Sequence, residues 1–269
     1  MALADLDWRL IAEERRPGAV QMALDEIAAE TAAAGGPATI RVYRWQPGTV
    51  SLGYSQNRAI LDLDYCDRAG IDVTRRQTGG GTIYHDDWGD ISYSIIAPAE
   101  ALPGDLMESY RLLCTPLFAA LEQLGVDARF VEGERDAVFE PACYLRALHP
   151  AHDVVGPDGR KLSGNAQYRQ REAVVQHGSI TFDRATETHL EIFADCDVTA
   201  ADFENRVGAI TDYADCSRAE AVSAIEDALG AWAGAEAGSW TDEELAAARA
   251  RTREKFASDT WVEGRTDPT

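Results

Sequence analysis

Lysine is almost absent from this sequence. Lys161 and Lys255 are the only two among 269 residues, against 23 arginines, while 46 acidic residues give a net charge of −21. The acids are scattered along the whole chain, a pattern typical of salt-adapted, haloarchaeal proteins. A negative potential of this size repels nucleic acid and anionic lipid, so neither is an expected partner. Each surviving lysine is informative, because arginine could have supplied ordinary surface charge.

A long hydrophobic run is also missing. No stretch approaches the roughly 18 consecutive apolar residues that a membrane span needs. The opening MALADLDWRLIAEERRPGAV carries acids and arginines where a secretory peptide would carry a basic end and an apolar run. Apolar residues still make up 45% of the chain, enough for a folded core. These features predict a soluble, cytoplasmic protein.

Cysteine is sparse and irregularly placed. The five cysteines are odd in number and form no CxxC pair. The five histidines form no metal-ligand spacing either, and only His149 and His152 lie close together, in a loop. We therefore expect neither a disulfide framework nor a structural metal, and the ligands of any other metal ion are left unknown.

Periodicity and turn residues predict one α+β domain. Helical spacing marks residues 17–33 and 103–125 and two late segments, RAEAVSAIEDALGAWAG and DEELAAARARTREKFAS, the second opened by a capping box of Thr241 and Glu244. Strand-like segments lie between them, namely ATIRVYRW, TVSLGYS, IDVTRRQ, GTIYHDD, DISYSIIAP, DARFVEG, AVVQHGSITFD and the hairpin DVVGPDGRKLSG. Because strands and helices do not alternate regularly, we expect a mixed, mostly antiparallel sheet with flanking helices.

The first candidate site segment is RRQTGGGTIYHDD at residues 75–87. Three adjacent glycines cost much backbone entropy on folding, which indicates a tight turn or the close approach of a ligand to the backbone. Arg75 and Arg76 could donate to a phosphate or a carboxylate. The alternative is a flexible hairpin loop with solvated arginines. The spacing matches neither a Walker loop nor a dinucleotide fingerprint.

The second candidate segment, GRKLSGNAQYR at residues 159–169, places Lys161 at a strand start beside a turn. A lysine there can hold a phosphate or acyl phosphate and stabilise charge that develops during group transfer. The alternative, an ordinary surface lysine, suits Lys255 in a late, exposed-looking helix. In QHGSI, His177 belongs to a strand expected beside that of Lys161. For His177 and His85 a positioning role is favoured over general base catalysis.

Four segments occur together in the order seen in a known family. GYSQN, RRQTGGGTIYHD, GRKLSGNAQ and QHGSI resemble the biotin and lipoate protein ligase family over roughly residues 20–185, and FASDTW resembles the end of its large domain. The resemblance implies the α+β catalytic domain that class II aminoacyl-tRNA synthetases and biotin ligases share. The RRQTGGG form resembles the lipoate side more than the biotin side.

The resemblance also implies a site and a reaction. Lys161 would contact the activated carboxyl and the phosphate, and the residues binding lipoyl group and nucleotide would be Arg76, Gly79, Gly80, Gly81, His85, Gly164, Ala166, Gln167, His177 and Gly178. The expected enzyme is a lipoate-protein ligase, in which ATP and Mg activate lipoate (or octanoate) to an acyl-adenylate. The acceptor would be a lysine of a lipoyl domain of 2-oxoacid dehydrogenases or of the glycine-cleavage H protein. No tightly bound cofactor is expected.

A second branch of the family transfers an octanoyl or lipoyl group from a carrier protein through a cysteine thioester, without ATP. Cys143, in FEPACYLR, lies 18 residues before Lys161, close to where that branch keeps its nucleophile. The alternative for Cys143 is a small buried hydrophobe. HDVVGPDGRKLSGNAQ favours the ligase branch, whose members often have an acidic or amide residue just before the strand that leads to the lysine.

The sequence stops just after FASDTW, whereas many bacterial ligases continue into an accessory domain. We therefore expect a single lipoate-protein ligase-type catalytic domain over residues 1–269. Either a separate accessory-domain protein assists it, or adenylation is not performed. A carrier-protein binding module is the non-enzyme alternative. Lys161, Arg76 and the glycine turn argue against it, because a docking surface needs none of them.

Overall fold

A large mixed sheet forms the centre of the computed structural model, which describes residues 3–169 and 172–269. Its eight strands run in the order β11-β1-β2-β6-β10-β9-β8-β7, and a separate three-stranded sheet runs β4-β3-β5. Neighbours from β2 to β7 are antiparallel, whereas β1 is parallel to both β2 and β11. The predicted α+β architecture with a mostly antiparallel sheet is confirmed.

The strands are β1 (Trp8–Arg16), β2 (Ala38–Trp45), β3 (Thr49–Leu52), β4 (Asp72–Arg75), β5 (Ile83–His85), β6 (Asp90–Pro98), β7 (Arg129–Phe130), β8 (Asp153–Val155), β9 (Lys161–Arg169), β10 (Ala173–Thr181) and β11 (Glu236–Ala237). The α-helices are α1 (Gly18–Ala33), α2 (Leu63–Arg68), α3 (Leu106–Gln123), α4 (Thr186–Glu191), α5 (Ala200–Arg206), α6 (Arg218–Ala233), α7 (Asp242–Arg251) and α8 (Asp259–Val262). Short 3-10 turns are η1 (Leu3–Asp5), η2 (Arg58–Ile60), η3 (Ala99–Ala101) and η4 (Ile210–Asp212), and η5 (Thr252–Phe256) is a π-helical turn.

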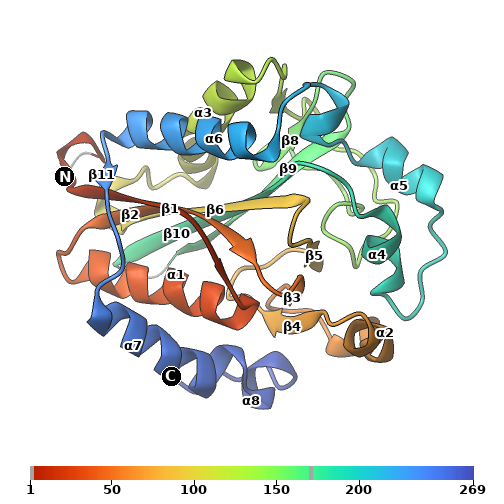
Figure 1. Cartoon of the computed structure of the whole chain (residues 1–269), viewed down its shortest axis with the longest axis horizontal. Coiled ribbons are helices and arrows are strands. Elements are labelled where there is room, and N and C mark those ends of the chain that lie inside the picture. The colour runs from red at the N-terminus through yellow and green to blue at the C-terminus, as the bar shows by residue number, and fades with distance from the viewer. Residues whose placement is uncertain (1–2, 170–171) are drawn as a thin grey trace.

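Helices cover both faces of the large sheet (Figure 1). α3 and α6 lie on one face, and α1, backed by α7 and α8, lies on the other. Strand alternation explains this packing, because Ile40 and Val42 of β2 belong to the core under α3 and α6, while Tyr43 and Trp45 belong to the core against α1. Both faces of β2 are therefore buried. None of the described helices is long and apolar enough to cross a membrane.

The predicted hairpin before the second candidate segment is confirmed. β8 and β9 pair antiparallel around a turn in which Gly159 has a φ of 82°, a left-handed conformation that favours glycine. Lys161 is the first residue of β9, as expected. The segments predicted as strands on either side of QPG also form strands, but β2 and β3 belong to different sheets.

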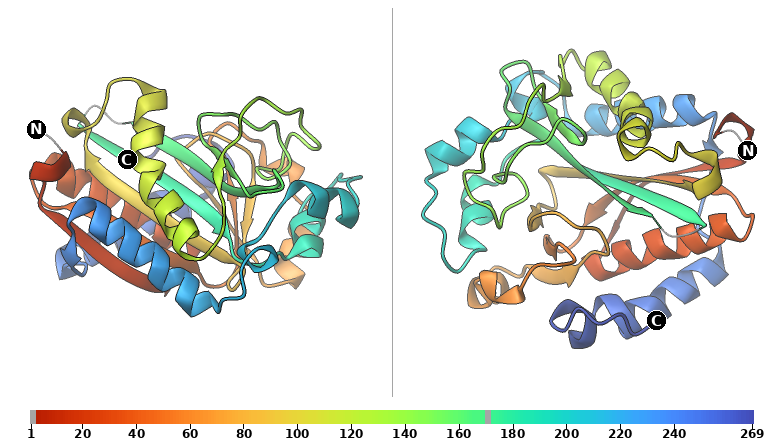
Figure 2. Two further views of the ribbon diagram at one scale, coloured as in Figure 1. Left: turned by 90° about the horizontal axis from the view of Figure 1, so that it is seen from above. Right: turned by 180° about the vertical axis from the view of Figure 1, so that it is seen from behind.

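One end of the molecule carries the long irregular connections. Figure 2 shows the loop between β7 and β8 at the same end as α4 and α5. The small sheet lies near the same end, and the loop joins it through a bridge between Thr82 and Ala142. The candidate site segments meet here.

Lys255 is fully buried, so its assignment as a surface lysine is wrong. Its Nζ donates to Glu26 Oε1 at 2.9 Å and to Asp267 Oδ2 at 2.6 Å, and it lies 4.7 Å from the centre of the Trp261 ring. The π turn η5 after α7 directs this side chain toward α1 instead of solvent. An ammonium group there compensates the two carboxylates, and Arg251 Nη1 also pairs with Glu26 Oε2 at 2.9 Å.

Candidate active site

A cavity of about 530 Å³ opens between the two sheets and the β7–β8 loop. It is lined by Met22, Tyr43, Trp45, Arg76, Gly79, Gly80, Ile83, His85, Ser92, Tyr110, Glu134, Glu140, Cys143, Arg146, Ala147, Leu148, His149, His152, Asp153, Lys161, Gly164, Asn165, Ala166, Gln167, His177, Gly178 and Ser179. The side chains of His149 and His152 are 47% and 36% exposed, which marks the mouth of the cavity. His85 and His177 are buried at its deep end.

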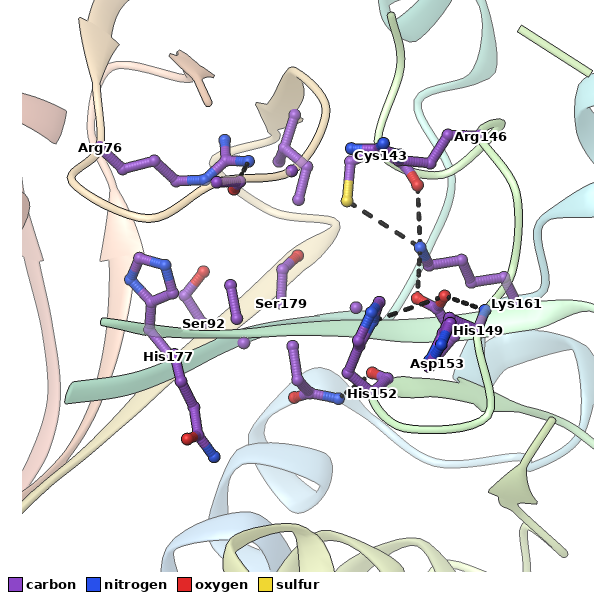
Figure 3. Close-up of a pocket in the computed structure, with 18 of the residues that line it drawn as sticks. Arg76, Ser92, Cys143, Arg146, His149, His152, Asp153, Lys161, His177 and Ser179 are labelled. Atoms are coloured by element: carbon purple, nitrogen blue, oxygen red, sulfur yellow. Dashed lines mark hydrogen bonds and ion pairs between the residues drawn. The ribbon is translucent and has the colours of Figure 1, made fainter. Parts of the chain in front are cut away.

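Lys161 is a buried cation at the mouth end (Figure 3). Its Nζ donates to Asp153 Oδ1 at 2.7 Å and to the Cys143 carbonyl at 2.8 Å, and it lies 3.9 Å from Cys143 Sγ. Burial by itself lowers the pKa of Lys161, but the electrostatic interactions with Cys143 and Asp153 outweigh it and raise the pKa above its ordinary value. Lys161 therefore stays protonated and supplies a fixed positive charge beside the thiol.

Asp153 is the partner that holds this charge. Burial raises the pKa of its carboxyl, yet the Lys161 ammonium and the neighbouring His152 lower it well below its usual range. The second carboxylate oxygen of Asp153 accepts a hydrogen bond from the His149 backbone N–H at 2.8 Å. The carboxylate is thus ionised and fixed in position.

Cys143 is partly exposed and faces the cavity. Its backbone N–H donates to the Thr82 carbonyl at 2.8 Å, and the Thr82 N–H donates to the Pro141 carbonyl at 2.8 Å. Gln56 strengthens this junction, because its Nε2 donates to the Pro141 carbonyl and its Oε1 accepts from Thr82 Oγ1. The thiol therefore lies on a backbone segment that the glycine-rich loop holds in place. It is partly exposed to the cavity and partly packed against the neighbouring hydrophobic core.

The three consecutive glycines serve this junction. A Cβ on Gly81 would come within 2.7 Å of the Cys143 backbone nitrogen, so only glycine allows the two chains to approach this closely. Gly80 has a φ of 96°, a conformation that side chains rarely adopt. The close approach predicted for the glycine run is present, but at Gly81 the partner is the Cys143 segment.

Arg76 lines the cavity, but its terminal nitrogens are occupied. Nη1 donates to the Ser51 carbonyl and hydroxyl at 2.7 and 2.9 Å, and Nη2 donates to the Gly79 and Gly81 carbonyls at 3.1 and 2.6 Å. Burial lowers the pKa of its guanidinium. Arg76 ties the glycine turn to β3, and its four terminal N–H groups are not free for a phosphate.

Arg75 points away from the cavity, so the expected pair of arginine donors is wrong. Its guanidinium, fully buried, donates to the backbone carbonyls of Gly53, Tyr54, Gln56, Trp261 and Val262. Adjacent residues of a strand point to opposite faces, which separates Arg75 from Arg76. Arg75 instead links α8 to the loop after β3.

The two deep histidines are held by polar partners on both ring nitrogens. His85 contacts Asp90 Oδ2 at 2.7 Å and Ser51 Oγ at 2.8 Å, and its ring stacks on Trp45 at 3.9 Å. His177 contacts Thr78 Oγ1 at 2.7 Å and Asp25 Oδ2 at 3.4 Å. These contacts suit residues that fix the cavity wall.

The structure brings most of the predicted site residues together. Besides Lys161 and Cys143, the cavity is lined by Arg76, Gly79, Gly80, His85, Gly164, Ala166, Gln167, His177 and Gly178, whereas Gly81 supports it from outside. Sequence reasoning assigned no role in the site to Asp153 or to the mouth residues Arg146, His149 and His152. The register of the predicted hairpin offered a signal, because Asp153 pairs with Gly164 on the strand of Lys161.

No three histidine, cysteine or acidic side chains within residues 3–169 and 172–269 are arranged to hold a metal ion. What the cavity does offer is a thiol beside an ammonium group, with the apolar side chains of Met22 and Trp45 among those that line its interior. This combination suits nucleophilic chemistry on an acyl group.

Comparisons with known proteins agree on one family. Residues 17–230 match the family model of the lipoyl protein ligase A/B catalytic domain. An octanoyltransferase LipM of Symbiobacterium thermophilum is 38% identical over 188 residues, 66% of each chain. The LipM of Geobacillus kaustophilus is 31% identical over 94% of this chain and 97% of its own. A solved structure from an archaeal lipoylation system, the bipartite lipoate protein ligase of Thermoplasma acidophilum with its E2 lipoyl domain, has a TM-score of 0.82 at 25% identity and covers 98% of this chain and 99% of that one.

These relatives overturn the expected reaction. The interpretation as an ATP-dependent lipoate-protein ligase is wrong, because the curated relatives named here are octanoyltransferases. The segment with an acidic residue that favoured the ligase contains Asp153, the first residue of β8. Its carboxylate forms an ion pair with Lys161. Arg76 and Lys161, the cations expected to hold phosphates, both bind protein groups instead. Because the match covers most of the chain, this protein belongs to the lipoyl protein ligase A/B catalytic domain family, a family of enzymes.

Proposed function

We propose that this chain transfers an octanoyl group from a carrier-protein thioester to a lysine of a lipoyl domain or of the glycine-cleavage H protein, through a thioester on Cys143. The observation that carries the proposal is the position of Cys143 Sγ, 3.9 Å from the buried Lys161 ammonium inside the cavity. The names of the curated relatives support the octanoyl group as the cargo.

In the first step Cys143 attacks the carbonyl carbon of the incoming thioester. A bond forms between Sγ and that carbon, the bond from the carbon to the carrier sulfur breaks, and the proton of the Cys143 thiol ends on the departing carrier thiol. The Lys161 ammonium lies 3.9 Å from Cys143 Sγ and stabilises negative charge on the sulfur during the attack.

In the second step the acceptor lysine attacks the Cys143 thioester. An amide bond forms, the bond from Sγ to the acyl carbon breaks, and one proton of the acceptor ammonium is released to solvent while another returns to Cys143. Lys161 stabilises the sulfur as it leaves, because the ammonium is already fixed in place by Asp153.

The acyl tail belongs at the deep end of the cavity. Met22, Tyr43 and Trp45 line this end and are each 1% exposed. Burying a methylene group contributes about 0.8 kcal/mol, so an eight-carbon chain gains most of its binding energy there. The thioester carbon then remains near Cys143.

A transfer assay without ATP tests the proposal. The carrier protein loaded with octanoate is mixed with an apo lipoyl domain and with wild type, Cys143→Ala or Cys216→Ala. We expect octanoylated lipoyl domain from wild type and from Cys216→Ala, whose altered residue lies outside the cavity, and none from Cys143→Ala. Full turnover by Cys143→Ala would refute the thioester route.

A further inference from the structure

The acceptor lysine must lose a proton before it can attack the thioester, and neither Cys143 nor Lys161 accounts for where that proton goes. A lysine side chain with a pKa of about 10.4 arrives as an ammonium and cannot attack until it loses a proton. Lys161 is itself held protonated, and Asp153 is a weak base because its pKa is depressed. His85 and His177 lie at the deep end with both ring nitrogens engaged. The base must therefore come from the mouth of the cavity.

The hydrogen bonds of the two mouth histidines distinguish them. His149 Nδ1 accepts the Ala151 backbone N–H at 3.1 Å, so the neutral ring carries its proton on Nε2 and has no free lone pair. His152 has the opposite arrangement. Its Nδ1 lies 3.6 Å from Asp153 Oδ2, which favours the proton on Nδ1 and leaves the lone pair on Nε2.

The ring of His152 is also held in place. Asn165 Nδ2 donates to the His152 carbonyl at 2.9 Å. The ring stacks on His149 at 5.2 Å with an interplanar angle of 10°, and the Tyr110 ring lies 5.5 Å away. Among the described residues, no hydrogen bond or ion pair engages its Nε2.

We propose that His152 is the proton acceptor for the incoming acceptor lysine. This inference rests on the proposed function and adds a residue to it. Asp153 joins the two parts of the site, because one carboxylate oxygen binds the Lys161 ammonium and the other faces His152. Figure 3 shows His152 and Lys161 on either side of this carboxylate.

The proposed step balances. The acceptor ammonium gives one proton to His152 Nε2 and becomes an amine, its nitrogen forms a bond with the acyl carbon, and the bond from that carbon to Cys143 Sγ breaks. The second proton leaves the nitrogen for Cys143, which regains its thiol. His152 then releases its proton to solvent at the exposed mouth.

The pH dependence of the second step follows from the groups that face His152. These are Asp153 of β8, Lys161 of β9 through that carboxylate, Tyr110 of α3, and His149 with Glu134 of the β7–β8 loop. A neutral His152 is required to accept the proton, so we expect the rate of the second step to rise with pH. Without His152 the increase in the rate of the second step shifts to higher pH, toward the pKa of the free acceptor lysine.

Single-turnover kinetics separate the two steps. Octanoyl-enzyme is formed from the loaded carrier protein and isolated, its mass is measured, and apo lipoyl domain is added at pH values from about 5 to about 9. We expect His152→Gln to form octanoyl-enzyme as wild type does, and to transfer its acyl group about 100-fold more slowly at neutral pH. Added imidazole should restore part of that rate. His149→Gln is the comparison variant: it removes the ring that stacks on His152 but no proton acceptor, so its transfer rate should still rise with pH as in wild type.

The other possible results of this experiment would each overturn a different part of the mechanism. An unchanged pH profile and rate in His152→Gln would overturn the role of His152 while leaving the thioester mechanism intact. A loss of octanoyl-enzyme formation in that variant, with an unchanged melting temperature, would place His152 in the first step and overturn the proposal as well. Failure of wild type to form octanoyl-enzyme would overturn the proposed function itself.

Discussion

Lys161 and Asp153 form a buried pair in which each group depends on the other. Both side chains are nearly inaccessible, at 1% and 3% exposure, and their nitrogen and oxygen atoms are 2.7 Å apart. Removing one partner of such a pair leaves an uncompensated charge in the interior, whereas removing both can be nearly neutral. The proposed catalytic contribution of Lys161 and its structural contribution are therefore separable by experiment.

For Lys161→Ala we expect loss of acyl transfer together with a fall of about 3 to 5 kcal/mol in the free energy of unfolding, because the Asp153 carboxylate is left unpaired. The double variant Lys161→Met/Asp153→Asn should regain most of that stability and still lack transfer. Urea unfolding and the transfer assay check both results. Normal turnover by Lys161→Ala would remove Lys161 from the mechanism.

The glycine turn provides a second test at single residues. A Cβ on Gly81 would meet the backbone of Cys143 and Ala142 at 2.7 to 2.9 Å, whereas a Cβ on Gly79 would meet nothing within 4 Å. We expect Gly81→Ala to slow thioester formation at least tenfold and to lower the melting temperature, because the Cys143 segment must move. Gly79→Ala should leave the melting temperature unchanged. Equal melting temperatures for the two variants would contradict the packing described here.

Site residues that belong to recognisable segments could be predicted, whereas the roles of His149 and His152 in the β7–β8 loop could not. Lys161, the glycine run and His177 stand in segments with clear strand or turn patterns. His152 stands in an irregular loop, where only the fold brings it beside Asp153. Arg75 and Arg76 show the same limit, since their sequence positions are equivalent and only the strand geometry separates them.

Strong hydrophobic periodicity and clear turn signals predicted elements that carry the site. A strand rich in charged residues was not predicted. The apolar spacing of α3 and the turn between β8 and β9 were sufficient signals. β1, by contrast, reads WRLIAEERR, and its charged half does not alternate, so the strand was not expected. The charged half of β1 is only partly buried and pairs with β2 across a bulge. This tertiary contact, which the local sequence does not predict, forms the strand.

α7 carries an acidic residue whose ionisation stabilises the fold. Glu244 completes the predicted capping box with Thr241 and binds the Arg9 guanidinium, with Arg9 Nη1 at 2.9 Å. Burial raises the pKa of Glu244, but the hydrogen bonds from Arg9 and Thr241 outweigh it and lower the pKa to about 2. The carboxylate therefore joins α7 to β1 at neutral pH.

This pKa predicts the pH range in which the contact contributes. In the unfolded chain Glu244 titrates near about 4.3, so its stabilisation is fully present above that pH and disappears as pH falls toward about 2. We expect Glu244→Gln to lower the free energy of unfolding by about 2 kcal/mol at pH 7 and by little near pH 2. The exposed Glu243→Gln makes the same charge change and should show no such dependence in acid unfolding experiments.

At the scale of the whole molecule, both lysines are inaccessible despite a highly charged surface. Lys161 is 1% exposed and Lys255 is fully buried, each beside carboxylates. In the proposed mechanism a lysine amine attacks an acyl thioester, and neither Lys161 nor Lys255 is exposed at the surface to compete for the acyl group. We expect an amine-reactive ester to modify neither residue in the folded protein and both in urea, as peptide mass mapping would show. Rapid labelling of Lys255 in the native state would contradict its burial.

The cavity itself arises from segments far apart in the sequence. α1, β2, the glycine turn, the β7–β8 loop and β9 with β10 each contribute a wall, and two sheets with different strand orders bring them together. Sequence patterns predict the helices and strands, but they do not show how the two sheets are placed relative to each other. This is why the sequence placed Lys161 at the start of a strand but did not predict its environment, and why the reaction was assigned to the wrong branch of the family.

The most direct test of the mechanism is the mass of the intact protein after mixing with an octanoyl-loaded carrier protein in the absence of ATP. We predict one octanoyl group on Cys143, labile to hydroxylamine and lost when apo lipoyl domain is added, and no adduct on Cys143→Ala. Octanoylation of the lipoyl domain at the wild-type rate by Cys143→Ala, or an adduct that the lipoyl domain cannot discharge, would contradict it.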